Sequence, residues 1–173
     1  MPDLASIPSG AAVFVDTNIF YLHYRGQSVT CTAFINRIYR GDVIAYVNTN
    51  VLADLLHNLM LAESIKKGFI EKKSAYKLKK LLTDDRNMAT QLTEYQQQFE
   101  NTVNIGLKVL NVTPKLIVET YTERQQYGLL TTDSIHVGNM NRHRVPIVNI
   151  ATYDGDFEHI DGLTMWKPMD VMQ

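Results

Sequence analysis

Four aspartates that lie far apart in the sequence occupy equivalent positions relative to the predicted secondary structure. Each follows an apolar run typical of a buried strand or lies in the first turns of a predicted helix: Asp16, Asp54, Asp133 and Asp154. In a parallel α/β sheet, the carboxyl ends of the strands and the starts of the following helices share one edge, and ligands bind there. The sequence therefore predicts that these four carboxylates meet in one pocket, with Asp156 beside them.

Carboxylates that share a pocket repel one another. At a separation of about 5 Å, two unit charges cost roughly 3 kcal/mol when the effective dielectric constant is near 20. Each aspartate taken alone is better explained as a helix cap or a turn residue, because Asp is favoured there. The joint pattern instead favours a hard divalent cation, since Mg²⁺ and Mn²⁺ prefer carboxylate and water oxygens. Such an ion acidifies a bound water and neutralises charge on a phosphate.

The elements that have to position these aspartates alternate between strand and helix. Short apolar runs predict the strands, and 145–152 is the most strand-like of them, a run that we expect to be entirely buried. Apolar residues at spacings of three and four, together with capping residues, predict the helices. The predicted strands are 11–15, 43–47, 109–112, 145–152 and 163–166, and the predicted helices are 30–40, one that Thr49 or Asn50 caps, one from Thr113 and Pro114 to Gly128, and one from Asp133.

This order of elements predicts an α/β fold, namely a three-layer α/β/α sandwich with a mostly parallel sheet. Residues 63–104 show no strand pattern, and their apolar residues form one stripe of a long amphipathic helix: Met88, Leu92, Tyr95, Phe99 and Val103. We therefore expect a single domain over residues 1–173 that contains a helical insertion over 63–104.

The composition excludes several classes of protein. The chain has 173 residues, of which 45% are hydrophobic and 20% charged, with a net charge of −1, which is ordinary for a globular domain and not for a disordered or fibrous chain. Cys31 is the only cysteine, so no intrachain disulfide and no cysteine-cluster zinc site can form. No apolar run approaches the roughly 18 residues of a membrane span, and no secretory signal pattern is present. We expect a soluble cytoplasmic protein with no membrane association.

The charges are unevenly distributed along the chain. Residues 65–80 contain seven lysines and one glutamate, a net charge of +6, so the remainder of a chain whose total is −1 carries −7. A lysine run can follow a nucleic-acid backbone, because neutralising phosphates releases counterions, or it can simply be a solvated helix face. The nucleic-acid interpretation assigns phosphate contacts to Lys72, Lys73, Lys79 and Lys80.

Four sequence blocks resemble, in order and spacing, the motifs of PIN-domain proteins. The blocks are VFVDTNIF (13–20), VNTNVLADLLH (47–57), GLLTTDSIHVG (128–138) and IATYDGDFEHIDGLTMWKP (150–168). Together they cover essentially the whole chain except 63–104, and the specific parts are VDTN and TYDGDF followed by GL and W. The resemblance implies a PIN-like, 5′-nuclease-like sandwich and Mg²⁺- or Mn²⁺-dependent cleavage of RNA by an acidic pocket.

The resemblance also implies roles for individual residues. The second acid of the family is usually glutamate, and here the matching residue is Asp54, which is one methylene shorter. Asn18 and Thr152 resemble polar residues that orient the pocket, although an N-cap and a strand-end hydroxyl would account for them equally well. The implied reaction is hydrolysis by a metal-activated water in line with the leaving 3′-oxygen. The acids fall on five positions, all expected metal ligands except Asp54: Asp16, Asp54, Asp133, Asp154 and Asp156.

Two histidines lie three residues after proposed acids and hence on the same helix face, namely His57 after Asp54 and His136 after Asp133. They are candidates for binding metal or phosphate, but histidines at helical spacing are more often packed or surface residues.

The commonest role that the resemblance implies is the toxin of a VapC-like toxin–antitoxin pair. The expected partners are then RNA, a cognate antitoxin protein and a second copy of the chain. A housekeeping RNA-processing nuclease stays open because the insertion lengthens the chain. A catalytically silent PIN-like scaffold that binds RNA or protein also stays open, because Asp54 departs from the usual glutamate. A phospho-accepting receiver domain fits poorly, since Asn111 to Thr113 stand where its acceptor aspartate would be.

Overall fold

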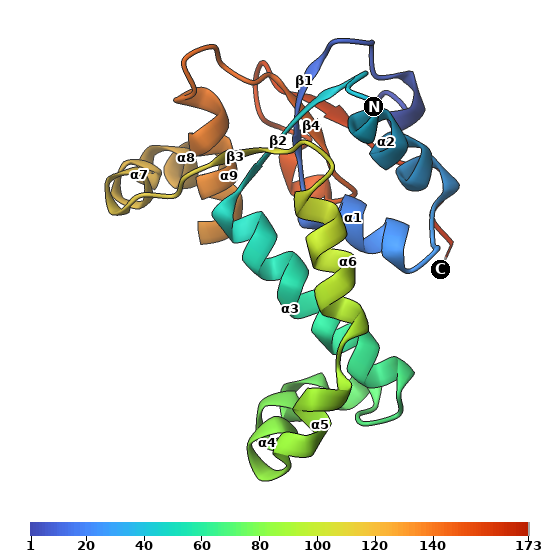
Figure 1. Ribbon diagram of the computed structural model, residues 1–173. Coiled ribbons are helices and arrows are strands. Elements are labelled where there is room, and N and C mark those ends of the chain that lie inside the picture. Colours follow the sequence, from blue (N-terminus) through green and yellow to red (C-terminus); the bar gives the residue numbers. More distant parts are fainter. Residues whose placement is uncertain (173) are drawn as a thin grey trace.

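Five short parallel strands form the central sheet of the protein (Figure 1). The computed structural model describes residues 1–172, apart from the side chain of Lys73. The sheet order is β3-β2-β1-β4-β5, which confirms the predicted α/β class and differs from the 2-1-3-4-5 order of receiver domains. The strands are β1 (Ala12–Val15), β2 (Ile44–Asn48), β3 (Lys108–Leu110), β4 (Asn149–Ala151) and β5 (Thr164–Trp166).

Helices cover both faces of the sheet. From β1 to β3 the chain moves toward one edge, and it then returns to β4 on the other side of β1. Because crossovers between parallel strands are right-handed, the helices of these two stretches lie on opposite faces, as Figure 1 shows for α1 and α2 against α7 to α9. The first group contains α1 (Thr17–Tyr24), α2 (Val29–Tyr39), α3 (Thr49–Lys66) and α6 (Glu94–Val103), and the second contains α7 (Pro114–Glu119), α8 (Tyr121–Tyr127) and α9 (Thr131–Asn141).

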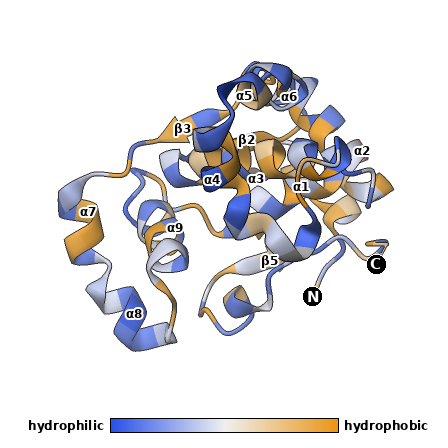
Figure 2. Cartoon of the chain, turned by 90° about the horizontal axis from the view of Figure 1, so that it is seen from below, coloured by the Kyte–Doolittle hydropathy of each residue, from blue (hydrophilic) through white to orange (hydrophobic). Residues whose placement is uncertain are grey.

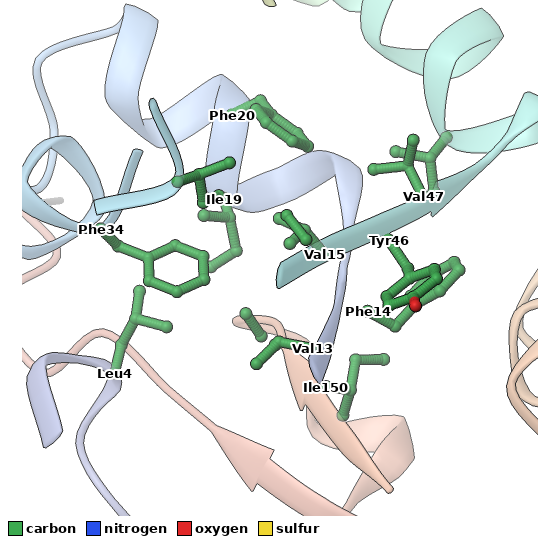
Figure 3. Close-up of a cluster of buried hydrophobic side chains, with 14 of the residues drawn as sticks. Leu4, Val13, Phe14, Val15, Ile19, Phe20, Phe34, Tyr46, Val47 and Ile150 are labelled. Carbon is green, nitrogen blue, oxygen red and sulfur yellow. The ribbon is translucent and has the colours of Figure 1, made fainter. Parts of the chain in front are cut away.

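The hydrophobic core lies on both faces of the central strand. Val13, Phe14 and Val15 of β1 are fully buried, and Phe14 is paired in register with Tyr46 of β2 and Ile150 of β4 (Figure 3). Figure 2 shows hydrophobic residues gathered around α1 and α3, whereas α8 on the outside is mostly hydrophilic. Because the side chains on both faces of this strand are buried, its sequence is a continuous apolar run, as is usual in parallel sheets.

Residues beyond the end of α3 form a helical arm that projects away from the sheet (Figure 1). α6 packs against α3 on the way back to the sheet. We call the three short helices between them the arm tip: η2 (Lys72–Lys77), α4 (Leu78–Asp84) and α5 (Arg86–Gln91). Within the described part of the chain, no helix is both long enough and apolar enough to cross a bilayer.

The single long helix predicted over 88–103 is wrong, because α5 and α6 are separate helices. The buried carboxylate of Glu63 accepts hydrogen bonds from the backbone N–H groups of Thr93 (3.1 Å) and Tyr95 (2.9 Å). These bonds satisfy amide groups that the start of a helix leaves without partners, and so they favour a new helix start here. Val103, the last member of the predicted stripe, is exposed.

The strand predicted over 145–152 is reduced to the three residues of β4. Val145 and Val148 are 70% and 51% exposed, so the expectation of an entirely buried run is also wrong. The prediction that Thr49 or Asn50 caps α3 is also wrong. The N-cap is Asn48, whose side chain accepts a hydrogen bond from the Val51 N–H. α1, which follows β1 at once, was not among the predicted helices.

The helix predicted from Thr113 to Gly128 begins and ends as expected but is divided. Thr113 caps α7, and Gly128 closes α8 with a positive φ of 67°. The division falls at Thr120, whose methyl carbon Cγ2 faces Gly138 of α9. A Cβ atom added at Gly138 of α9 would come within 2.4 Å of that methyl group. Gly138 therefore allows the close approach of α9, the helix that carries Asp133.

We expect Gly138→Ala to destabilise the protein despite the better helix propensity of alanine. Overpacking of this kind costs about 1–3 kcal/mol, against a gain of about 1 kcal/mol for replacing glycine in a helix. Urea unfolding should show a net loss for G138A. Adding Thr120→Ser removes the obstructing methyl group and keeps the hydroxyl, so the double variant should recover stability relative to G138A. Simple additivity of the two single changes would contradict this packing account.

Candidate active site

The topological switch point of the sheet lies between β1 and β4. The chain leaves β1 toward β2 and later enters β4 on the opposite side, so the connections that follow these two adjacent strands diverge. In open α/β sheets such a divergence leaves a crevice outside the carboxyl ends of the strands. Asp16 follows β1 directly, and Thr152 and Asp154 follow β4. Three of the predicted site residues thus come from the two strands that border the crevice.

Asp16 is the N-cap of α1 and is almost entirely buried, with 9% of its surface exposed. One carboxylate oxygen accepts a hydrogen bond from the Thr17 backbone N–H at 2.6 Å. The other oxygen accepts from the Asn18 side-chain amide at 2.5 Å and from the Thr152 hydroxyl at 2.6 Å. The carboxylate is therefore held by groups that follow both β1 and β4.

The same hydrogen bonds extend to the loop after β4. The Asn18 carbonyl oxygen accepts from the Tyr153 N–H at 2.9 Å, and the Thr152 hydroxyl accepts from the Asp154 N–H at 3.0 Å. Asp154 in turn caps η3 (Gly155–Phe157) by accepting from the Asp156 N–H at 3.0 Å. Asn18 is thus not the N-cap of α1, and both Asn18 and Thr152 position the residues around Asp16.

A single pocket of about 290 Å³ brings together residues from all four predicted positions. Asp54 lies in the second turn of α3 and is exposed, whereas Asp133 lies in the first turn of α9 and is partly buried. Asp156 is exposed and is not among the residues that line the pocket. The lining comprises Asp16, Thr17, Asn18, Tyr21, Asp54, His57, Asn58, Thr132, Asp133, His136 and Asp154.

The carboxylates of this pocket influence one another electrostatically. The pKa of Asp16 is raised to about 6, first by burial and then by the negative charges of Asp133 and Asp154, against the hydrogen bonds from Thr152 and Thr17, which lower it. The pKa of Asp133 is also raised, first by burial and then by the charges of Asp154 and Asp156. Burial is the larger cause of both raised pKa values, and the neighbouring negative charges add to it. Among the described residues, no Lys or Arg forms an ion pair with any of the four pocket aspartates.

The chemistry of the pocket fits a hard divalent cation. Its charged groups are carboxylates, which Mg²⁺ and Mn²⁺ prefer, and no Lys or Arg in the described part of the chain pairs with them. In the residues that the structure covers, no three His, Cys, Asp or Glu side chains are arranged to hold one ion. Mg²⁺ needs fewer protein ligands than that, because it usually keeps several waters and binds through one or two carboxylates together with substrate phosphates.

A buried network of polar side chains next to the pocket was not predicted from the sequence. The Asn48 side chain contacts His136 Nδ1 at 2.9 Å and Asn139 Oδ1 at 3.0 Å. His136 is only 2% exposed, and burial lowers its pKa to about 4. The only signal in the sequence was the spacing of His136 from Asp133. Nothing local indicated that Asn48, 88 residues earlier, would contact it.

The lysines predicted to bind phosphates lie on the arm tip. Lys72 of η2 and Lys79 and Lys80 of α4 are exposed, and the side chain of Lys73 is outside the described residues. A groove of about 460 Å³ between α3 and the arm tip is lined by both Lys79 and His57. Since His57 also lines the acidic pocket, the groove and the pocket adjoin.

The fold and the acidic pocket define an α/β protein with a carboxylate site at the switch point of its sheet. No protein-family model matches the chain, and no curated protein matches it in sequence. It is similar to a solved structure of VapBC2 from Rickettsia felis bound to a DNA fragment from their promoter, with a TM-score of 0.55 and 14% identity over 90% of this chain and 98% of that one. A toxin-antitoxin complex from Klebsiella pneumoniae gives a TM-score of 0.48 and 16% identity over 88% and 95% of the two chains. The first likeness establishes the shared fold.

Asp16→Asn should change how stability depends on pH. The pKa of Asp16 in the folded protein, about 6, lies above the ordinary value of 3.8. The stability that the protonated form contributes is therefore complete below about pH 4 and is lost as the pH rises through 6. Between pH 4 and pH 7, wild type should lose about 2 kcal/mol relative to D16N, as measured by urea unfolding in EDTA. The exposed Asp161 supplies the control D161N, and parallel profiles for wild type and D16N would refute the assignment.

Proposed function

We propose that the protein is a metal-dependent endoribonuclease that hydrolyses RNA phosphodiesters and leaves 5′-phosphate and 3′-hydroxyl ends. One observation carries the proposal: four aspartates from four separate segments line a single pocket, and none of them forms an ion pair with a Lys or Arg side chain that the structure describes. The position of that pocket at the switch point of a parallel sheet, where ligands of such folds bind, supports it.

The proposed roles of the side chains follow from their burial and their hydrogen bonds. Asp16 and Asp133 would hold Mg²⁺ or Mn²⁺ most directly, with Asp154 as a further ligand and Asp156, which does not line the pocket, as an additional one. Such an ion supplies an acidified water and neutralises charge on the phosphate. Asn18 and Thr152 fix the rotamer of Asp16, because both donate to its carboxylate. Asp54, which is exposed at the rim, orients water.

We further propose that the protein acts as the toxin of a toxin–antitoxin pair. The shared fold with a chain of the VapBC2 structure, over 98% of that chain, supports this role. The partners would be RNA, a cognate antitoxin protein and a second copy of this chain. The neighbouring reading frame offers a direct check, since a short, overlapping upstream gene for a DNA-binding protein would favour the toxin over a housekeeping nuclease.

Neutralising the pocket aspartates one at a time should abolish cleavage. We expect D16N and D133N to reduce Mn²⁺-dependent cleavage of single-stranded RNA by about a hundredfold or more, because loss of a ligand removes several kcal/mol of transition-state stabilisation. D161N, which changes an exposed aspartate outside the pocket, should keep wild-type activity. Full activity of D16N would refute the site. A wild type that binds RNA but never cleaves it would favour the catalytically silent scaffold instead.

Reversing the charge of the arm tip should weaken RNA binding and its dependence on salt. For K72E/K79E/K80E we expect the slope of log affinity against log salt to fall by about 2, since each phosphate contact on single strands contributes about 0.7. The matched control R40E/K108E/R144E changes the net charge equally at three exposed positions near the amino ends of the strands. Fluorescence anisotropy at several salt concentrations measures both slopes. Equal slopes for the two variants would remove the arm tip from the RNA site.

A further inference from the structure

One nitrogen of the buried His136 ring is left without a partner in the acidic pocket. Nδ1 contacts the Asn48 side chain, but Nε2 has no hydrogen-bond partner within the described chain. Among the described residues, no buried side-chain nitrogen or oxygen lacks a partner. Nε2 is therefore not sealed from solvent, although the residue as a whole is 2% exposed. His136 lines the acidic pocket, and we infer that the small opening at Nε2 faces it.

Backbone groups at both ends fix the orientation of the side chains behind His136. The Asn48 carbonyl oxygen accepts from the Val51 backbone N–H at 3.0 Å, so the Asn48 amide nitrogen must face His136 Nδ1 and Asn139 Oδ1. At the other end, the Asn139 amide donates to the Asn111 backbone carbonyl at 3.2 Å. Neither amide can be reversed without placing two donors or two acceptors against each other.

This orientation determines where the proton of His136 lies. Since the Asn48 amide donates to Nδ1, the neutral ring carries its proton on Nε2. A second proton on Nδ1 would point at the Asn48 N–H, and burial independently lowers the pKa to about 4. Ligation of a metal through Nε2 would require the same unfavourable proton at Nδ1. His136 therefore presents a fixed, neutral N–H donor to the pocket and not a metal ligand.

We propose that His136 donates a hydrogen bond from Nε2 to a non-bridging phosphate oxygen of a nucleic acid bound in the acidic pocket. The proposal rests on the proposed function and assigns part of its substrate recognition. Carboxylates repel phosphate, and a fixed donor among them favours one position of the phosphate over others. No pocket carboxylate accepts from Nε2, so the donor is available.

Nuclear magnetic resonance of the wild type tests the proposal without any substitution. In protein labelled with ¹⁵N-histidine, a long-range ¹H–¹⁵N spectrum should show His136 protonated at Nε2 alone between pH 5 and pH 8. Addition of a short single-stranded RNA, with Ca²⁺ replacing Mg²⁺ to prevent turnover, should shift the Nε2–H resonance. A ring protonated at Nδ1, or an Nε2–H resonance that RNA leaves unmoved, would overturn the proposal.

Two substitutions separate the donor from the ring. The side-chain amide of His136→Gln reaches the Nε2 position, whereas that of His136→Asn reaches only the Nδ1 position. We expect H136N to bind the same RNA about tenfold more weakly, and H136Q to retain most of the affinity, because a hydrogen bond to a charged group is lost only in the first. The control H143Q changes a histidine outside the pocket and should leave the affinity unchanged.

The outcomes distinguish this inference from the proposed function. A wild type that cleaves RNA while H136N binds as tightly as H136Q would overturn the inference and leave the nuclease intact. A wild type that binds RNA with a shifted Nε2–H resonance, but cleaves nothing, would support the inference and refute the nuclease. Thermal unfolding of each variant shows whether it is folded, and the wild-type spectra decide the question if H136N is not.

Discussion

Burial of the Asp16 carboxylate at the boundary between β1 and β4 is the constraint on which the site depends. A charged group with 9% exposure is unfavourable unless hydrogen bonds compensate it, and here one backbone amide and two side chains do so. Because Thr152 belongs to the far side of the switch point, the compensation also fixes the start of the loop after β4. The position of Asp154 follows from that of Asp16 through this hydroxyl.

The compensation is incomplete, and this has a consequence for the whole pocket. Hydrogen bonds lower the pKa of Asp16, yet burial and two neighbouring carboxylates keep it near 6. No described Lys or Arg relieves this charge, and the lysines of this chain concentrate in residues 65–80, on or near the arm. The acidic and basic residues therefore lie in separate regions. The acidic pocket adjoins the basic arm tip through a groove, because His57 lines both the pocket and the groove.

The sequence predicted the elements that depend mainly on the preferences of their own residues. The runs 11–15 and 43–47 are strands because nearly every residue in them is apolar, and Thr113 and Gly128 mark helix ends by their own conformational preferences. Two of the failures have a different cause, namely contacts between distant segments. Glu63 starts a helix 31 residues later in the sequence, at Glu94, and Gly138 brings α9 against the break at Thr120. The strand order predicted that the aspartates share one pocket, but it did not predict how exposed each aspartate is to solvent.

The hydrogen bonds of His136 show what the structure adds to the spacing of residues in the sequence. From the sequence, its position one turn after Asp133 made it a candidate for binding metal or phosphate, although a packed or surface histidine was the commoner explanation. The orientation of Asn48, fixed by a backbone N–H, assigns the proton of His136 to Nε2 and so withdraws the imidazole lone pair from the pocket. The ligand atoms that remain in the pocket are mostly oxygens, with the exposed His57 as the remaining imidazole. Such a set favours hard cations such as Mg²⁺ and Mn²⁺ over zinc, which prefers imidazole and thiolate ligands.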